Sequence, residues 1–218
     1  MRKSIGTLAL LGILALPGAA SAQLALDLKT GYALPLGDAF TGGGQMSGAL
    51  KNVVSATVPI EVAGRWRFTP NLSAGVYFQY DPGWASTFVC ISPYSCYAYD
   101  TRVGVEVAWA LNPEGTFNPW LSVGTGWEWT GLSVTVPEGQ TGAGKHTSSL
   151  TGWEYVNVQV GTDFNLSERF GLGPWVGFFA GAYSSRTDWT PTGGGSIPSD
   201  QRTFHGWVQF GLKGTVYL

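Results

Sequence analysis

Apolar and polar side chains alternate with a period of two along most of the chain. The clearest case is the segment FHGWVQFGLKGTVYL, residues 204–218, whose even positions are all apolar or glycine. Seven earlier segments repeat this pattern. Because successive side chains of a strand point to opposite faces, each segment is expected to be a strand with one apolar and one more polar face. The eight predicted strands span residues 24–36, 55–68, 72–81, 101–111, 119–129, 153–164, 170–183 and 204–218.

The connections between these strands alternate in length. Short connections follow strands two, four and six, at residues 69–71, 112–118 and 165–169. Long connections follow strands one, three, five and seven, at about 38–54, 82–99, 131–150 and 184–203. Short turns at one end, long loops at the other and an even strand count are typical of a membrane-spanning barrel. We therefore predict an all-β fold, an eight-stranded antiparallel up-and-down transmembrane β-barrel with short periplasmic turns and long extracellular loops.

Aromatic residues on the apolar faces gather at two levels, with aliphatic residues between them. Two such belts are expected where a barrel meets the two lipid interfaces. A soluble barrel with these residues in its core is the alternative, but it does not explain the paired belts. The belt near the short turns comprises Trp66, Phe68, Trp109, Phe164 and Phe170, and the belt near the long loops comprises Tyr80, Trp127, Trp129 and Phe204.

The first 22 residues read as a secretory signal peptide. Arg2 and Lys3 precede an apolar run, and Ala20-Ser21-Ala22 forms a small-residue cleavage site. We expect a signal peptide at 1–22 and one barrel domain at 23–218. Charged residues are only 12% of the chain, with 12 Lys and Arg against 14 Asp and Glu, compared with about 25% in typical soluble domains. The absence of a basic run argues against a nucleic-acid partner.

The whole mature chain resembles the small eight-stranded bacterial outer membrane barrels of the outer membrane protein A, X and W kinds. The C-terminal strand is also similar to the sorting signal of such barrels: Phe210, Leu212 and Val216 fit it, although Leu218 stands where an aromatic residue is usual. The resemblance implies a porin-like monomer in the outer membrane of a Gram-negative bacterium, in contact with lipid and lipopolysaccharide. It is a likeness of architecture and carries no activity.

The polar faces of the predicted strands carry ten charged side chains that would point into the barrel. An eight-stranded barrel is narrow enough for side chains to fill it, and buried charges must pair. The strand register predicts that Arg102 lies beside Glu128, and that Lys29 approaches Lys213 with Asp27 between them. Such a charge network would plug the interior. The predicted network comprises Asp27, Lys29, Glu61, Arg65, Arg67, Arg102, Glu106, Glu128, Asp163 and Lys213.

Inward glycines leave a second interpretation open, a narrow channel for small or hydrophobic solutes. Their missing side chains either make room for inward-pointing aromatic rings or leave a cavity. The inward aromatic residues predicted from the alternation are Tyr77, Tyr155, Trp175 and Trp207.

Catalysis has a single candidate motif. His146 and Ser148, with Glu154 downstream, are similar to the arrangement of lipid A deacylases, in which histidine activates serine. The motif departs from that family at Ser149, where the family has Asn, and it falls in a predicted Gly/Ser/Thr-rich loop. We therefore expect no enzyme and no cofactor, with a lipid-modifying enzyme as the third hypothesis. No metal-spaced cluster or phosphate loop is present.

The long loops are the remaining candidates for function. Cys90 and Cys96 are expected to form a disulfide, because an exported protein meets an oxidising compartment. Aromatic and cationic loop residues would suit a protein or glycan partner; the alternative is that they pack on one another or enter lipopolysaccharide headgroups. These loop candidates are Trp84, Phe88, Tyr94, Tyr97, Arg186, Trp189 and Arg202.

Overall fold

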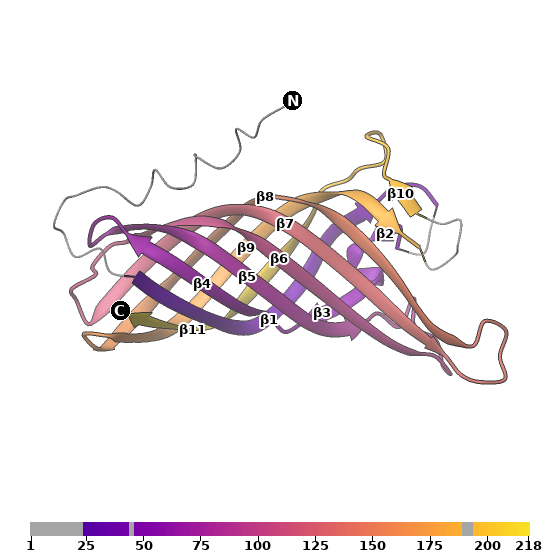
Figure 1. Ribbon diagram of the computed structural model, residues 1–218, viewed down its shortest axis with the longest axis horizontal. Helices are drawn as coiled ribbons and strands as arrows, with labels where there is room; N and C mark the ends of the chain where they lie inside the picture. Colours follow the sequence, from indigo (N-terminus) through magenta and orange to yellow (C-terminus); the bar gives the residue numbers. More distant parts are fainter. Residues whose placement is uncertain (1–23, 44–45, 189–193) are drawn as a thin grey trace, which may run out of the picture.

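The computed structural model describes residues 24–43, 46–188 and 194–218 (Figure 1). The predicted signal peptide at 1–22 and the loop residue Trp189 lie outside the described residues. No helix in the described ranges is long and apolar enough to cross a membrane.

The described chain forms one antiparallel sheet that closes on itself. The ring runs β1, β4 with β3, β5, β6, β7, β8, β9 and β11, so the predicted eight-stranded up-and-down barrel is confirmed. Two short strands, β2 and β10, lie in the long loops. The strands are β1 (Leu24–Phe40), β2 (Gly48–Ala49), β3 (Val54–Thr57), β4 (Ile60–Arg67), β5 (Leu72–Ala85), β6 (Ser95–Ala110), β7 (Phe117–Val136), β8 (Gly144–Ser167), β9 (Phe170–Thr187), β10 (Gly194–Ser196) and β11 (His205–Tyr217).

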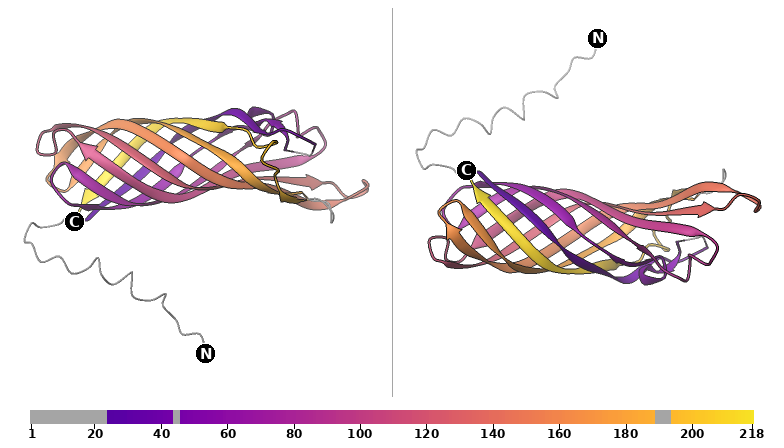
Figure 2. Two further views of the ribbon diagram at one scale, coloured as in Figure 1. Left: turned by 90° about the horizontal axis from the view of Figure 1, so that it is seen from above. Right: turned by 90° about the horizontal axis from the view of Figure 1, so that it is seen from below.

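The first and last strands of the ring pair along their whole length. The register runs from Ala25 opposite Tyr217 to Gly37 opposite His205, and Figure 2 shows β1 and β11 side by side. This pairing explains why alternation continues to the C terminus, since a spanning sheet cannot leave an edge open to lipid. The second ring strand is divided into β3 and β4 at Pro59, whose lack of an N–H removes a ladder hydrogen bond.

The strands continue well beyond the length needed to cross a membrane. β7 has 20 residues and β8 has 24, against roughly 9–11 for a tilted spanning strand. The predicted loop at 131–150 is therefore wrong for most of its length: Gly131 pairs with Ser149, and this pairing continues to Val136 opposite Gly144. On β7 the apolar residues of this extension, Leu132, Val134 and Val136, lie on the buried inner face and not on the outer face. The paired stretch of β8 is mostly Gly, Ser and Thr, which gives little hydrophobic signal.

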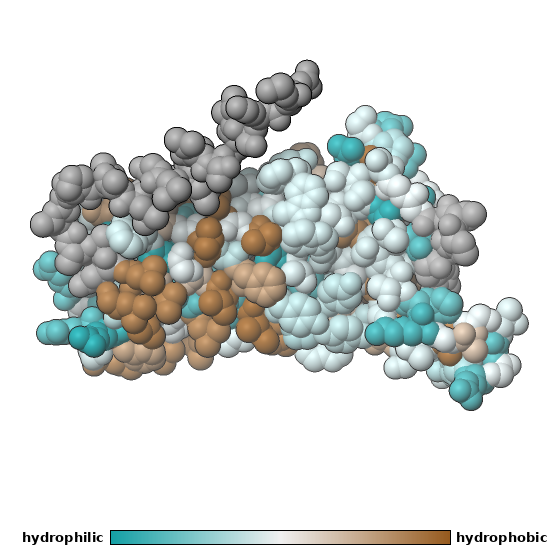
Figure 3. Space-filling model, in the orientation of Figure 1, coloured by the Kyte–Doolittle hydropathy of each residue, from teal (hydrophilic) through white to brown (hydrophobic). Residues whose placement is uncertain are grey.

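The two faces of the barrel differ as the alternation predicts. Outward side chains such as Leu28, Val76 and Phe78 are exposed, whereas inward polar side chains such as Lys29 and Gln79 are buried. Figure 3 shows apolar side chains gathered over the half of this face nearer the short turns, with a paler surface toward the long loops. A polar interior with an apolar exterior excludes the soluble-barrel alternative.

One stretch of β8 departs from the alternation. Glu154 pairs with Gly126 and Asn157 with Gly124, so three steps on β8 oppose two on β7. Tyr155 is the extra residue of this β-bulge and points outward, 53% exposed. The prediction that Tyr155 points inward is therefore wrong, and the bulge instead turns Glu154 into the interior, where it is buried.

Inward glycines make room for inward rings. A Cβ on Gly104 or on Gly126 would lie 2.5 Å from the hydroxyl oxygen of Tyr77, and a Cβ on Gly161 would lie 2.6 Å from the ring of Trp120. These glycines therefore accommodate the close approach of the rings.

The loop at 38–54 folds over the extracellular mouth. Its short 3-10 helix, Leu50–Asn52, places Leu50 in a fully buried position. An apolar cluster forms there from three loops and the inner faces of the extended strands. It includes Ala39, Phe40, Met46, Leu50, Val53, Val54, Leu132, Val134, Leu150 and Ile197.

Candidate functional site: the barrel interior and the extracellular loops

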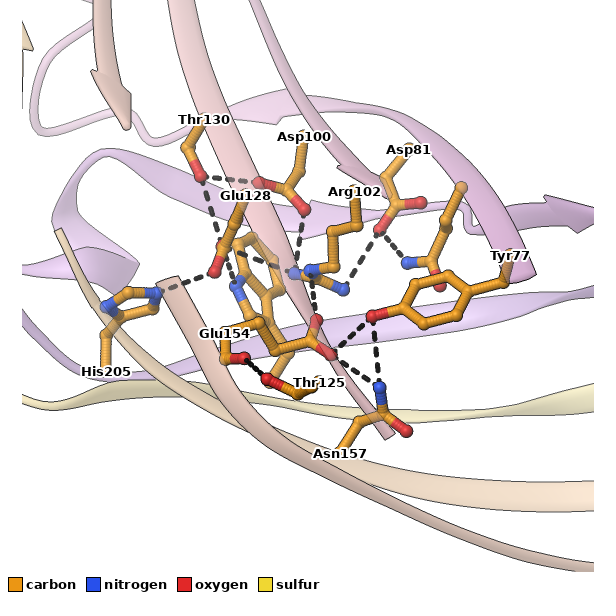
Figure 4. Close-up of polar contacts among 12 residues, drawn as sticks. Tyr77, Asp81, Asp100, Arg102, Thr125, Glu128, Thr130, Glu154, Asn157 and His205 are labelled. Atoms are coloured by element: carbon orange, nitrogen blue, oxygen red, sulfur yellow. Dashed lines mark hydrogen bonds and ion pairs between the residues drawn. The ribbon is translucent and has the colours of Figure 1, made fainter. Parts of the chain in front are cut away.

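The half of the barrel interior nearer the long loops, called the upper half below, is centred on Arg102 of β6 (Figure 4). Its guanidinium is fully buried and is surrounded by four carboxylates from four strands. The Nη2 atom lies 2.7 Å from Asp100 and 3.4 Å from Glu128. The Nε atom lies 3.4 Å from Glu154, and Nη1 lies 3.8 Å from Asp81. The rings of Phe179 and Trp207 lie 5.0 and 5.2 Å from its Cζ atom, a distance suited to cation–π contact.

Glu128 links this cluster to the last strand. It accepts hydrogen bonds from Trp207 Nε1 at 2.9 Å and from the Tyr183 hydroxyl at 3.0 Å. His205 Nε2 lies 2.8 Å from its other oxygen, and the imidazole stacks on Tyr183 with ring centroids 3.8 Å apart. These contacts join β6, β7, β9 and β11 across the lumen. The structure thus brings together Arg102 and Glu128, the pair that the register predicted.

Four members of this upper network were absent from the predicted set. The alternation along their strands points Asp81 and Asp100 into the barrel, but both residues lie at or just beyond the ends of the predicted strands. Glu154 was hidden by the bulge at Tyr155. His205 was placed inward by the alternation, yet only the folded ring shows that it meets Glu128 from a strand 77 residues away.

The lower half of the interior holds a second network. Lys29 Nζ lies 2.6 Å from Glu61 and 2.7 Å from the side-chain oxygen of Gln159, with Glu106 at 3.7 Å. Lys213 Nζ lies 2.9 Å from Asp163, whose other oxygen accepts a hydrogen bond from Trp120 Nε1 at 3.1 Å. Arg65 pairs with Asp27 and lies 3.8 Å from Glu106.

Two further members of the predicted network, Asp27 on β1 and Arg67 on β4, differ in their contacts. Lys29 lies opposite Lys213 in the register, as predicted. Asp27 forms ion pairs with Lys213, at 4.0 Å, and with Arg65, whereas the ion pairs of Lys29 are with Glu61 and Glu106. Arg67 lies half-exposed at the short-turn end. It donates to the carbonyl oxygen of Pro70 and lies over the ring of Tyr217, because the strand ends there and the lumen opens to solvent.

The two networks and the apolar cluster around Leu50 follow one another along the lumen of the described barrel. A hollow of about 630 Å³ lies at the short-turn end, lined by turn residues that include Arg67, Pro113, Glu114 and Glu168. A smaller space of about 30 Å³ lies next to it, and its lining reaches Asp163 and Lys213 of the lower network. This arrangement cross-links the eight strands through buried ion pairs and hydrogen bonds.

The predicted disulfide Cys90–Cys96 is present, with the two Cα atoms 5.9 Å apart. It joins the 82–99 loop to the first residues of β6, since Cys96 already pairs with Val134 of β7. The aromatic loop candidates Trp84 and Phe88 are exposed, and Tyr94 and Tyr97 are also exposed.

The cationic loop candidates are partly engaged within the protein. Arg186 donates to the carbonyl oxygen of Gly43 and lies 3.7 Å from Asp188. Arg202 donates from Nε to the carbonyl oxygen of Ile197 at 2.9 Å. Arg186 therefore connects the end of β9 to Gly43 in the first long loop, whereas the contact of Arg202 lies within the last one.

The deacylase-like residues do not form a triad in this structure. His146 lies on β8, and Nε2 contacts the carbonyl oxygen of Gly142 at 2.7 Å. Ser148 is buried. The carboxylate of Glu154 contacts Tyr77, Asn157 and Arg102 in the lumen. The prediction that His146 and Ser148 lie in a flexible loop is wrong, because both belong to the extended β7–β8 hairpin.

No group of three or more His, Cys, Asp or Glu side chains within the described residues is arranged to hold a metal ion.

A closed eight-strand ring with an apolar exterior and a charged interior defines the fold of a small bacterial outer membrane β-barrel. No protein-family model matches the chain, and no curated protein matches it.

Solved structures share this fold at low sequence identity. A major outer membrane protein from Thermus thermophilus aligns with a TM-score of 0.56 and 10% identity, over 89% of this chain and 99% of that one. Neisserial surface protein A aligns with a TM-score of 0.52 and 11% identity, over 88% and 96% of the two chains. Ail, the attachment invasion locus protein of Yersinia pestis, solved with the heparin analogue sucrose octasulfate, aligns with a TM-score of 0.51 and 10% identity, over 91% and 100%. At these identities the likeness concerns the fold alone.

Proposed function

We propose that this protein is a monomeric scaffold in the outer membrane of a Gram-negative bacterium, exported by the signal peptide at 1–22, with a sealed lumen and functional extracellular loops. It acts by binding and not by catalysis, and it needs no cofactor. The observation that carries the proposal is the series of buried contacts along the lumen, made by the two charge networks and by the apolar cluster around Leu50.

The loops support a role in binding because a rigid scaffold holds them. Loops on such scaffolds commonly carry recognition. The extended β7–β8 hairpin projects beyond the ring (Figure 1), and exposed aromatic residues of the 82–99 loop offer contact surface for a protein, a glycan or lipopolysaccharide.

Single-channel conductance of refolded mature protein in a planar bilayer tests this proposal. A sealed scaffold gives no steady conductance, and the Glu128→Ala variant also stays silent, because the lower network and the apolar cluster still close the lumen. Steady current in the wild type that changes in Glu128→Ala would overturn the sealed-lumen interpretation. It would establish the runner-up, a narrow channel, with Arg102 and Glu128 lining the path.

A further inference from the structure

The 82–99 segment differs from the other long loops in its charge. It contains no Asp, Glu, Lys or Arg, whereas each other long connection carries at least two charged residues. The charged residues of the other loops are Asp38, Lys51, Glu138, Lys145, Arg186, Asp188, Asp200 and Arg202. An extracellular loop that faces only water has no physical need to avoid charge.

The exposed surface of this segment is strongly apolar. Phe88 is 73% exposed, Ile91 is 65% exposed and Trp84 is 57% exposed. Apolar side chains of this size are normally buried away from water, and an exposed cluster of them marks a contact surface. The backbone beneath them is held in one shape by the Cys90–Cys96 disulfide and by the hydrogen bond from Ser86 N to the carbonyl oxygen of Val53 at 3.0 Å.

This surface is continuous with the lipid-facing side of the barrel. Tyr80 belongs to the outer aromatic belt, and its hydroxyl lies 2.8 Å from that of Tyr97. Tyr97 in turn stacks on Tyr99 with ring centroids 6.2 Å apart. The ring of Tyr99 lies on Gly131 of β7, where a Cβ would approach it to 2.2 Å. Contacts among Tyr80, Tyr97 and Tyr99 therefore connect the belt to the base of the disulfide-bonded loop.

The height of Trp84 above the aromatic belt indicates which layer of the membrane surface it contacts. Trp84 lies four positions beyond Tyr80 on β5. At about 3.3 Å per residue and a strand tilt near 40°, Trp84 stands about 10 Å above the belt. An ordinary phospholipid headgroup region is only roughly 5–8 Å thick. Trp84 and Phe88 thus reach a layer that a sugar-bearing lipid fills and a phospholipid does not.

We propose that the stapled loop at 82–99 is a membrane-contact surface that packs on the sugar portion of glycolipids in the protein's own outer leaflet. Aromatic faces without charge suit uncharged sugar rings, and continuity with the lipid-facing belt directs the loop toward the leaflet and not toward solution. This inference rests on the proposed location in the outer membrane. It assigns recognition of soluble partners to the other three loops.

Hydroxyl-radical footprinting of the refolded protein in nanodiscs tests this assignment, since it measures the accessibility of individual side chains. We expect oxidation of Trp84 and Phe88 to fall about threefold or more in lipopolysaccharide-containing discs relative to phosphatidylcholine discs. Leu166, 65% exposed at the opposite, short-turn end of the same molecules, serves as the internal control and should react equally in both.

A double variant, Cys90→Ser with Cys96→Ser, should lose most of the protection at Trp84 while keeping the barrel folded. Equal oxidation of Trp84 and Phe88 in both discs would overturn the proposal and leave the surface to a soluble partner. Footprinting does not depend on whether the lumen conducts, so its failure is separate from failure of the sealed-scaffold proposal.

Discussion

Replacing Arg102 with methionine tests whether the upper network holds the barrel together. Methionine fills much of the same volume but carries no charge. The change leaves four buried carboxylates, from Asp81, Asp100, Glu128 and Glu154, without their shared cation. Removing one partner of a buried ion pair costs about 3–5 kcal/mol, because an uncompensated charge stays in a poorly solvated site.

The unfolding free energy of Arg102→Met is therefore expected to be lower than that of the wild type by at least this amount. Urea unfolding from lipid vesicles, followed by tryptophan fluorescence, measures the difference. Arg169→Met is the matched control, because Arg169 is exposed in a short turn, and it should change the free energy by less than about 0.5 kcal/mol. The deficit of Arg102→Met should shrink under acidic conditions, where protons neutralise the abandoned carboxylates.

A second substitution distinguishes electrostatics from packing. Asp100 is the carboxylate nearest Arg102, at 2.7 Å. Asp100→Asn alone should destabilise the barrel, because it removes half of a buried pair. In the Arg102→Met background the same change should stabilise it, because it removes an unpaired charge. A loss of less than about 1 kcal/mol for Arg102→Met, or an Asp100→Asn effect of the same sign in both backgrounds, would refute the reasoning.

Three further expectations follow from local contacts. Gly126→Ala should cost about 1–3 kcal/mol, because its Cβ would lie 2.5 Å from the Tyr77 hydroxyl oxygen; adding Tyr77→Phe should relieve part of this cost, as a double-mutant cycle by urea unfolding would measure. Cys90→Ser with Cys96→Ser should lower stability by up to about 2 kcal/mol, since the bond closes a short loop; an unchanged unfolding midpoint would contradict this. His146→Ala should leave the acylation profile of lipid A unchanged by mass spectrometry, and an altered profile would establish the enzyme hypothesis.

The barrel could be predicted from sequence because its two faces differ in chemistry at almost every position. Residues such as Leu28 and Lys29 alternate between lipid and lumen, and turn lengths then fix the register that places Arg102 opposite Glu128. The apolar cluster around Leu50 could not be predicted in this way. Its residues lie in loops without a period, and they become a core only when the loops at 38–54 and 184–203 meet over the mouth.

The interior partners were predictable only where the strand is regular. A bulge adds one residue and reverses the face of everything on one side of it. For this reason the alternation gave the wrong face for Tyr155 and concealed Glu154, which meets Arg102 and Tyr77 in the lumen. The bulge leaves no hydrophobic signature, because valine and tyrosine are compatible with either face.

Deleting the bulge residue tests this explanation directly. Tyr155 is extra with respect to both neighbours, since Glu154 and Val156 pair with the adjacent residues Gly181 and Ala180 of β9. Deleting Tyr155 should restore regular alternation, keep Glu154 and Asn157 inward, and yield a barrel that still shows the faster gel migration of folded protein in unheated samples. Deleting Val158, where pairing is regular, should instead turn buried polar side chains on one side of the deletion toward lipid. Exposing such groups to hydrocarbon costs several kcal/mol each, so this variant should fail to insert. If both deletions were equally tolerated, the bulge would not be what sets the facing of β8, and the assignment of Glu154 to the network would lose its structural cause.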